Sequence, residues 1–460
     1  MLARGRVRVT PLPLPLARRH LEELTFTKRD DFGAKGAAAA VTICAGAYDE
    51  ATATLEVPRA YGFAHFDVDV PCAETTPWHF EGALKDDHRS QPEAAAALME
   101  ALSDPKRRGG TLSLPCGYGK TCVALYICAQ RGGRAIILVH KSCLLEQWEE
   151  RIKTFLPSLS IGRLRGPKCD VEGKDVVLGM MQSIHSHPYP EAALTGYTTL
   201  VVDEAHHVPA DTFLDAVGKC GAEATLALTA TPERRDGLTG LLYAAMGNMA
   251  FAKEREWTAA RVKISTLPCK PTIREKKCYG AGSQERVNMS RLITDLCQDP
   301  MRNDAIVRDI INIFDENPDP TNGRYVIVLS DRIAQLKDLQ EKLLAANHPA
   351  LTSCGYGGAT LLIGATKAKD RQDALEARVV LSSYQFAAEG LDRPRFDTLI
   401  LASPKGDVTQ AVGRILRDHG DKNQPLILDY SESISSGVLF GLLAKRKKIY
   451  AAHGFDIHVE

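Results

Sequence analysis

Apolar residues in this chain gather into short runs, and longer segments with helical periodicity separate them. The runs in the first half cover residues 111–114, 135–139, 175–178, 199–202 and 224–228. Such nearly continuous apolar strands, alternating with helices, are typical of a parallel sheet that is buried on both faces. The pattern therefore predicts a doubly wound α/β domain over residues 85–252.

The second half repeats this alternation without repeating the sequence. Its apolar runs cover residues 261–267, 325–329, 361–363, 379–381, 398–401 and 426–428, with helical periodicity around Ile306, Ile310 and Ile313. We predict a second α/β lobe over residues 253–460. Residues 1–84 differ, because β-branched stretches at 41–44 and 53–57 indicate a small β-rich domain.

Composition limits the partners and the compartment. The 460 residues carry 57 basic and 57 acidic side chains, so a nucleic-acid site would have to be local. Twelve cysteines without a C-x-x-C pair indicate buried thiols in a reducing intracellular compartment, with a zinc site as the alternative. No apolar stretch is long enough for a bilayer span, so no membrane is expected as a partner.

The first twenty residues contain five arginines and no acid, around several prolines. A surface strand and turn is the expected structure, and a mitochondrial transit peptide is the alternative.

Residues 114–121 read Leu-Pro-Cys-Gly-Tyr-Gly-Lys-Thr between a predicted strand and a predicted helix. This order is typical of a phosphate-binding loop, in which Lys120 reaches the β- and γ-phosphates and Thr121 ligates Mg²⁺. The usual pattern has a glycine where Leu114 stands, so Gly117 and Gly119 are expected to form the bends. An ordinary surface loop is the alternative for this segment alone.

Two further segments follow apolar strands and carry reactive side chains. Asp203 and Glu204 end one strand, where the first could hold Mg²⁺ and the second could act as general base. Thr229 and Thr231 end the next strand and could sense what occupies the site. A solvent-exposed acidic turn and a hydroxyl turn before Pro232 are the respective alternatives.

The second half contributes basic and turn-forming residues. Arg414 and Arg417 are three residues apart and share a helix face, as guanidiniums that clamp a γ-phosphate would. A solvated helix face is the alternative for this pair. Gly390 permits a sharp turn after the strand at 379–381, and Asp392 could reach either a ribose hydroxyl or one of the two arginines.

Together these motifs resemble superfamily 2 helicases of the DEAD/DEAH type. The ordered set covers residues 114–121, 179–184, 203–206, 229–232, 388–392 and 410–417, and the resemblance extends over about 85–455. It is closest to the DNA-translocating branch: the helicase subunit of the nucleotide-excision-repair and transcription factor, phage recombination helicases, and transcript-release helicases of large DNA viruses. The resemblance implies two RecA-like lobes in tandem, with ATP and Mg²⁺ bound between them.

The resemblance also implies roles for individual residues. Lys120 and Glu204 would act in catalysis with Arg414 and Arg417, and Thr121 with Asp203 would hold the metal. Thr229, Thr231 and Gln410 would couple the ATP state to nucleic acid. The residues expected to bind the nucleotide besides Lys120 and Thr121 are Gln91, Pro115, Cys116, Gly117, Tyr118, Gly119, Gly390 and Asp392. Gln91 would read adenine, although the segment before it is one residue shorter than the family pattern.

The implied partner is a DNA or RNA backbone, with the transcription or repair machinery as a further partner and a monomer as the expected state. The residues expected to contact nucleic acid, mostly at phosphates, are His140, Lys141, Gln182, Ser183, Ser330 and Ser383. The basic stretch 444–448 could either touch the backbone or form a solvated helix face. Three alternatives remain: an RNA helicase on the same fold, a scaffold without ATPase activity, and a detached motor subunit of a restriction system.

Overall fold

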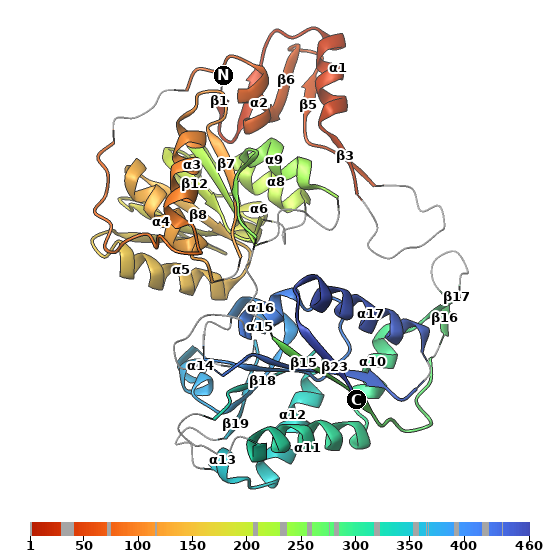
Figure 1. Cartoon of the computed structure of the whole chain (residues 1–460). Coiled ribbons are helices and arrows are strands. Elements are labelled where there is room, and N and C mark those ends of the chain that lie inside the picture. Colours follow the sequence, from red (N-terminus) through yellow and green to blue (C-terminus); the bar gives the residue numbers. More distant parts are fainter. Residues whose placement is uncertain are drawn as a thin grey trace. The chain divides into compact units, whose positions relative to one another are not determined.

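The computed structural model describes residues 2–28, 41–70, 75–115, 117–205, 210–230, 237–254, 260–275, 277–279, 285–316, 323–352, 358–364, 366, 368–390, 395–415, 423–434 and 436–460. The chain divides into two compact units, Met1–Arg255 and Glu256–Glu460 (Figure 1). Each unit contains one large sheet with helices on both faces. This architecture confirms the predicted α/β class with two doubly wound lobes and a small N-terminal sheet.

The N-terminal segment forms a four-stranded antiparallel sheet in the order β1-β2-β6-β5. Its strands are β1 (Leu2–Ala3), β2 (Arg6–Val9), β5 (Ala47–Asp49) and β6 (Thr54–Pro58), and its helices are α1 (Leu14–Glu23) and α2 (Arg59–His65). A separate pair joins β3 (Thr25–Thr27) to β4 (Thr42–Cys44). The strand predicted within the first twenty residues is confirmed by β1 and β2, but the helix α1 was not predicted. Pro13 and Pro15 stand at its start, where a helix tolerates proline.

The sheet of the first lobe has eight strands in the order β10-β9-β11-β8-β12-β13-β7-β14. Every neighbouring pair is parallel except β9 and β10. The strands are β7 (Gly109–Ser113), β8 (Ala135–Val139), β9 (Ile161–Arg165), β10 (Lys168–Asp170), β11 (Val176–Met180), β12 (Tyr197–Val202), β13 (Ala222–Thr229) and β14 (Met249–Ala252). The five predicted strands are confirmed, whereas β9, β10 and β14 were not anticipated.

Two hydrophobic clusters lie on opposite faces of this sheet. Along β8, Ile137 and Val139 belong to the cluster under α3, α4 and α5, whereas Ile136 and Leu138 belong to the cluster under α6, α8 and α9 (Figure 1). The helices are α3 (Gln91–Ser103), α4 (Lys120–Arg131), α5 (Ser142–Phe155), α6 (Met181–Ser186), α7 (Glu191–Leu194), α8 (Ala210–Lys219) and α9 (Thr239–Met246). Burial on both faces explains why the strands are apolar at successive positions.

The sheet of the second lobe has seven parallel strands in the order β19-β20-β18-β21-β22-β15-β23. They are β15 (Arg261–Leu267), β18 (Val326–Ser330), β19 (Ala359–Leu362), β20 (Val379–Ser383), β21 (Thr398–Leu401), β22 (Leu426–Glu432) and β23 (Asp456–Val459). A separate antiparallel pair consists of β16 (Lys277–Tyr279) and β17 (Glu285–Val287). All six runs predicted for this half correspond to strands, and β23 was not predicted.

Helices again cover both faces of the second sheet. One hydrophobic cluster includes residues of α11, α12 and α13, and the other includes residues of α14 to α17. The helices are α10 (Met289–Cys297), α11 (Pro300–Glu316), α12 (Ile333–Ala345), α13 (Pro349–Thr352), α14 (Ala368–Leu375), α15 (Tyr384–Gly390), α16 (Thr409–Ile415) and α17 (Gly437–Ala452).

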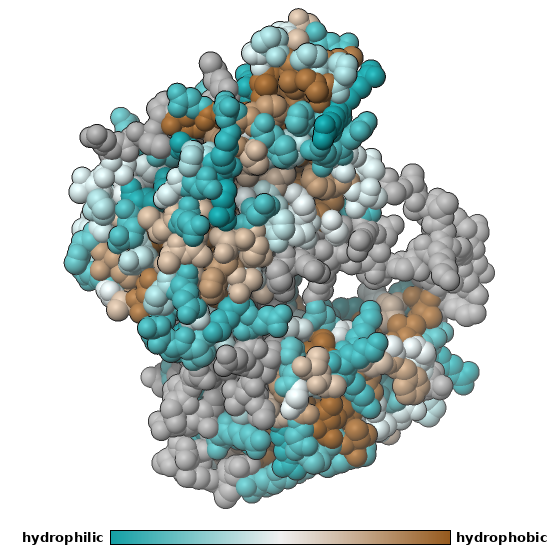
Figure 2. All heavy atoms as spheres, turned by 45° about the horizontal axis from the view of Figure 1, so that its top comes forward, coloured by the Kyte–Doolittle hydropathy of each residue, from teal (hydrophilic) through white to brown (hydrophobic). Residues whose placement is uncertain are grey.

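Polar residues dominate the surface in Figure 2, and hydrophobic residues form separate small groups on it. Within the described ranges, no helix combines the length and the hydrophobicity that a bilayer span requires. The same ranges hold no group of three or more His, Cys, Asp and Glu residues that could bind a metal ion by themselves. Cys128 and Cys220 are buried, and burial raises the pKa of each thiol to about 12.

Candidate nucleotide-binding site

The loop after β7 leads directly into the first turn of α4, which begins at Lys120. Gly117 and Gly119 have φ angles of 89° and 85°, so these two glycines form the left-handed bends that the sequence predicted. A Cβ on Gly119 would lie 2.3 Å from Gln91 Nε2. The loop therefore requires glycine at position 119. Separately, the first N–H groups of α4 are available to bind an anion, as at the start of any helix.

Lys120 is buried, and its ammonium donates a hydrogen bond of 3.0 Å to the carbonyl of Leu114. The Leu114 side chain is itself completely buried in the core of the lobe. The residue that departs from the usual loop pattern thus anchors the loop through its side chain and holds the lysine through its backbone. Thr121 is half-buried in the first turn of α4.

Asp203 follows the carboxyl end of β12, and its backbone N–H donates to Leu138 O at 3.0 Å. Asp203 is only 7% exposed, and its Oδ2 accepts a hydrogen bond of 2.8 Å from the indole of Trp148. Burial and the neighbouring charge of Glu204 raise the pKa of Asp203 to about 6, against the effects of Trp148 and Lys120. The carboxyl of Asp203 is therefore protonated more readily than that of a solvent-exposed aspartate.

Glu204 has a φ of 49°, a left-handed conformation that residues other than glycine seldom adopt. Such backbone strain costs on the order of 1–3 kcal/mol and concentrates at functional sites. The residue is half-buried, next to Asp203 and at the same end of the strand. His206, which completes the motif, lies outside the described residues.

Three adjacent strands bring these groups to one edge of the sheet. Strand β13 lies between β12 and β7, with Val202 opposite Ala227 and Thr229 opposite Ser113. Thr229 is fully buried, and its carbonyl accepts from the N–H of Leu114 at 3.3 Å. The phosphate-binding loop, the acid pair and Thr229 therefore share the carboxyl-terminal edge, where open α/β sheets bind ligands.

This edge fits a nucleotide and Mg²⁺. It provides a glycine loop without room for a Cβ at Gly119, one buried ammonium and one buried carboxylate. Lys120, Thr121 and Asp203 are the residues that would hold the phosphates and the metal.

Gln91 braces the loop from α3. Its Oε1 accepts from Lys85 N at 2.9 Å, and its Nε2 donates to Tyr118 O at 2.8 Å. The side chain is 3% exposed, so both ends of the amide are engaged with the backbone. The Tyr118 ring is buried and meets His88 edge to face at 5.3 Å. A contact between Gln91 and adenine stays a prediction.

The residues predicted to contact nucleic acid follow strand ends in both lobes. His140, Lys141 and Ser183 are half-buried, and Gln182 is exposed on α6. The Ser183 hydroxyl accepts from Gly166 N at 2.9 Å. Both ring nitrogens of His140 are buried, and a contact of these four residues with phosphates stays a prediction.

Ser383 and Ser330 end the strands β20 and β18 of the second lobe. Ser383 Oγ accepts from Phe386 N at 3.2 Å and is half-buried. Ser330 is fully buried, and its hydroxyl donates to Gln335 Oε1 at 2.6 Å. In this structure the Ser330 hydroxyl is thus engaged inside the lobe, which the sequence did not indicate.

Of the remaining predicted residues, some are assigned to helices and others lie outside the described ranges. Gly390 ends α15, and Gln410 and Arg414 belong to α16. Cys116, Thr231, Asp392 and Arg417 lie outside the described residues. Pro115 is buried directly before the glycine bends.

The basic stretch 444–448 lies on α17, and both alternatives for it were wrong at Arg446. This guanidinium is 3% exposed and pairs with Asp429 Oδ2 at 2.9 Å. It also donates to Tyr430 O at 3.0 Å. Arg446 is therefore a core residue, whereas Lys445 and Lys448 are exposed.

Sequence reasoning also missed Trp148. An aromatic residue in an amphipathic helix indicates only a core position, and its bond to Asp203 joins residues 55 positions apart. No local pattern could have revealed this pair.

Comparisons with known proteins place the chain among nucleic-acid motors. A family model described as "Type III restriction enzyme, res subunit" matches residues 85–234, a range that contains Lys120, Asp203 and Thr229. The protein L396 of Acanthamoeba polyphaga mimivirus, provisionally named an ATP-dependent RNA helicase, is 28% identical over 387 residues. This match covers 82% of the chain and 70% of that protein.

A second relative is the DNA 3'-5' translocase XPB2 of Sulfurisphaera tokodaii. It is 27% identical over 399 residues, covering 78% of this chain and 83% of that protein. Among solved structures, S. cerevisiae Dbp5 bound to RNA and ADP BeF3 has the same fold, with a TM-score of 0.54. Its sequence is 11% identical, and the match covers 80% of this chain and 89% of that one.

Proposed function

We propose that this chain is a motor acting on DNA. It belongs to the superfamily 2 helicases, in the family whose model is described as the res subunit of type III restriction enzymes. Its activity as an ATP-dependent helicase or translocase on nucleic acid follows from the family. The choice of DNA is supported by the relative named a DNA translocase, which covers 78% of this chain. The relative named for RNA helicase activity supports the alternative, an RNA helicase on the same fold.

The observation that carries the ATPase is the shared edge of β7, β13 and β12. We assign Lys120 to the β- and γ-phosphates, and Thr121 with Asp203 to Mg²⁺, which supplies charge neutralisation for the phosphates when bound. Glu204 follows Asp203 directly, and as a half-buried carboxylate it can accept the proton of the attacking water.

Other residues complete the assignment. Arg414 and Arg417 would stabilise the charge that develops on the transferred phosphoryl group. Thr229, Thr231 and Gln410 would couple the nucleotide state to nucleic acid. The hydrogen bond from the N–H of Leu114, at the start of the phosphate-binding loop, to the carbonyl of Thr229 supports this proposal.

Glu204→Gln tests the general base. The variant should bind ATP normally but lose about 10²–10⁴-fold in nucleic-acid-stimulated phosphate release, the usual contribution of a positioned base. Phosphate release and ATP affinity would be measured in parallel. A wild-type rate in Glu204→Gln would contradict the assignment.

The substrate is tested by comparing ATPase stimulation with single-stranded DNA, duplex DNA and RNA at matched salt, because salt dominates such affinities. DNA should stimulate more strongly than RNA. Stronger stimulation by RNA would favour the alternative, and no phosphate release with any of them would indicate a scaffold without ATPase activity.

A further inference from the structure

Trp148 is buried at the centre of α5, with 1% of its surface exposed. Its ring packs in the cluster between α3, α4, α5 and the sheet, yet its one polar atom does not bond to the backbone. The indole N–H instead donates to Asp203 Oδ2 at 2.8 Å. A buried indole N–H requires an acceptor, and here the acceptor is a carboxylate assigned to the nucleotide site.

This bond restricts the carboxylate of Asp203. The backbone of Asp203 is already held, because its N–H extends the ladder between β12 and β8 through Leu138 O. Without such a bond, the carboxyl group of an aspartate adopts a broad range of torsion angles about its terminal C–C bond. A hydrogen-bond donor at Oδ2 selects one orientation of the Asp203 carboxylate. The donor itself is fixed, because close packing prevents the indole ring of Trp148 from rotating.

We propose that Trp148 is the positioning residue that presents Asp203 to the Mg²⁺ of the bound nucleotide. The inference rests on the proposed function, since it concerns the same site. Metal-binding carboxylates commonly depend on a hydrogen bond from a residue that does not touch the metal. Trp148 is such a residue, because it bonds to Asp203 and acts through this carboxylate without touching the nucleotide.

Two replacements separate the hydrogen bond from the packing. Trp148→Phe removes the donor and part of the ring. Replacement by benzothienylalanine keeps the bicyclic shape and removes only the N–H, so it remains informative where Trp148→Phe fails to fold. Trp78→Phe is the matched control, because Trp78 packs partly buried against the same hydrophobic cluster.

The experiment measures binding of fluorescent ADP to the full chain as a function of Mg²⁺ concentration, and again in EDTA. Loss of such a hydrogen bond typically lowers metal affinity by 10–100-fold. Both Trp148 replacements should therefore raise the Mg²⁺ concentration for half-maximal binding by about tenfold or more. Their ADP affinity in EDTA should equal that of the wild type, and Trp78→Phe should change neither value.

An unchanged Mg²⁺ requirement in the benzothienylalanine protein would overturn the inference. An equal loss of affinity with Mg²⁺ and in EDTA would overturn it as well, because it would indicate general damage to the loop. If the wild-type chain binds no ADP even with Mg²⁺, the proposed function itself fails, and this result differs from both outcomes above.

Discussion

Single residues decide whether the phosphate-binding loop can form. Leu114 replaces the usual glycine without harm, since its side chain reaches the core and its carbonyl holds Lys120. Gly119 allows no such exchange. It combines a φ of 85° with a neighbour at 2.3 Å from any added Cβ, namely Gln91 Nε2. To make room, Gln91 would have to abandon its bond to Tyr118 O, which braces the loop.

Gly119→Ala should therefore weaken ADP binding by about tenfold or more, the effect of roughly 1.4 kcal/mol. Gly173→Ala is the matched control, because Gly173 has a φ of 65° but nothing within 4 Å of an added Cβ. The control should lose about 1 kcal/mol of stability from its left-handed alanine and bind ADP normally. Equal ADP affinities in the two variants would show that the contact with Gln91 does not matter.

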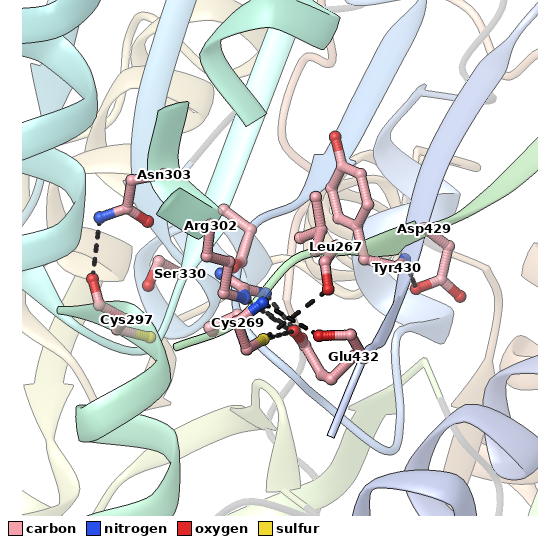
Figure 3. A network of polar contacts seen from close by, with 12 residues as sticks. Leu267, Cys269, Cys297, Arg302, Asn303, Ser330, Asp429, Tyr430 and Glu432 are labelled. Atoms are coloured by element: carbon pink, nitrogen blue, oxygen red, sulfur yellow. Dashed lines mark hydrogen bonds and ion pairs between the residues drawn. The ribbon is translucent and has the colours of Figure 1, made fainter. Parts of the chain in front are cut away.

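At the scale of elements, buried polar pairs hold the second lobe together at its strand ends. Arg302 on α11 and Glu432 at the end of β22 are joined at 2.9 Å, and their side chains are only 1% and 4% exposed (Figure 3). Arg302 also donates to Ala402 O at 2.6 Å, just after β21. Burial acts to lower the pKa of Arg302, but the charge and the hydrogen bonds of Glu432 together outweigh burial and raise this pKa. The pair thus fixes two strand ends and one helix.

Arg302→Met should destabilise the second lobe by about 3–5 kcal/mol, because it leaves the buried Glu432 charge without its partner. Combining it with Glu432→Met should restore much of this loss. Hydrogen–deuterium exchange in α11 and β22 would measure the effect on the lobe itself.

Lys342→Met on α12 provides the control, since Lys342 pairs with Asp304, also on α11, at 2.6 Å near the surface. Its effect should stay below about 1 kcal/mol. Exchange protection that falls equally in Arg302→Met and Lys342→Met would contradict the special role of the buried pair.

At the scale of the whole molecule, the N-terminal segment and the first lobe belong to one compact unit. Arg59 on α2 is completely buried and donates to Ala222 O and Glu223 O, at the start of β13, at 2.6 and 2.9 Å. Burial lowers the pKa of Arg59 most, and the charges of nearby Arg108 and Arg131 lower it further, to about 9. Arg59 therefore remains charged at neutral pH. The segment is therefore attached through the sheet that carries the nucleotide site.

Arg59→Leu should reduce the free energy of unfolding of the first unit by about 3 kcal/mol, because two buried carbonyls lose a charged donor. Thermal unfolding of the full chain, followed by tryptophan fluorescence, would detect this change through Trp78 and Trp148. Arg8→Leu is the control, since Arg8 is exposed and pairs with Glu56 at the surface; it should cost less than about 1 kcal/mol. A similar shift in both variants would mean that Arg59 does not attach the segment.

The sequence alone determined the features that depend on contiguous residues. Apolar runs predicted all the central strands of both sheets, because a strand buried on both faces must be apolar at every position. The glycine bends and the acid pair could also be predicted from the sequence, because each motif lies within a few residues of one strand end. The helix α1 was missed because its prolines suit a helix start as well as a turn.

Only the tertiary structure decided which distant side chains meet. Trp148 and Asp203 are 55 positions apart, Arg302 and Glu432 are 130, and Arg59 and Ala222 are 163. A hydrogen bond in a close-packed interior depends on positions defined to a few tenths of an ångström, and the order of strands in the sheet sets those positions. The burial of Ser330 and Arg446 follows from the same packing, which no residue pattern along the chain expresses.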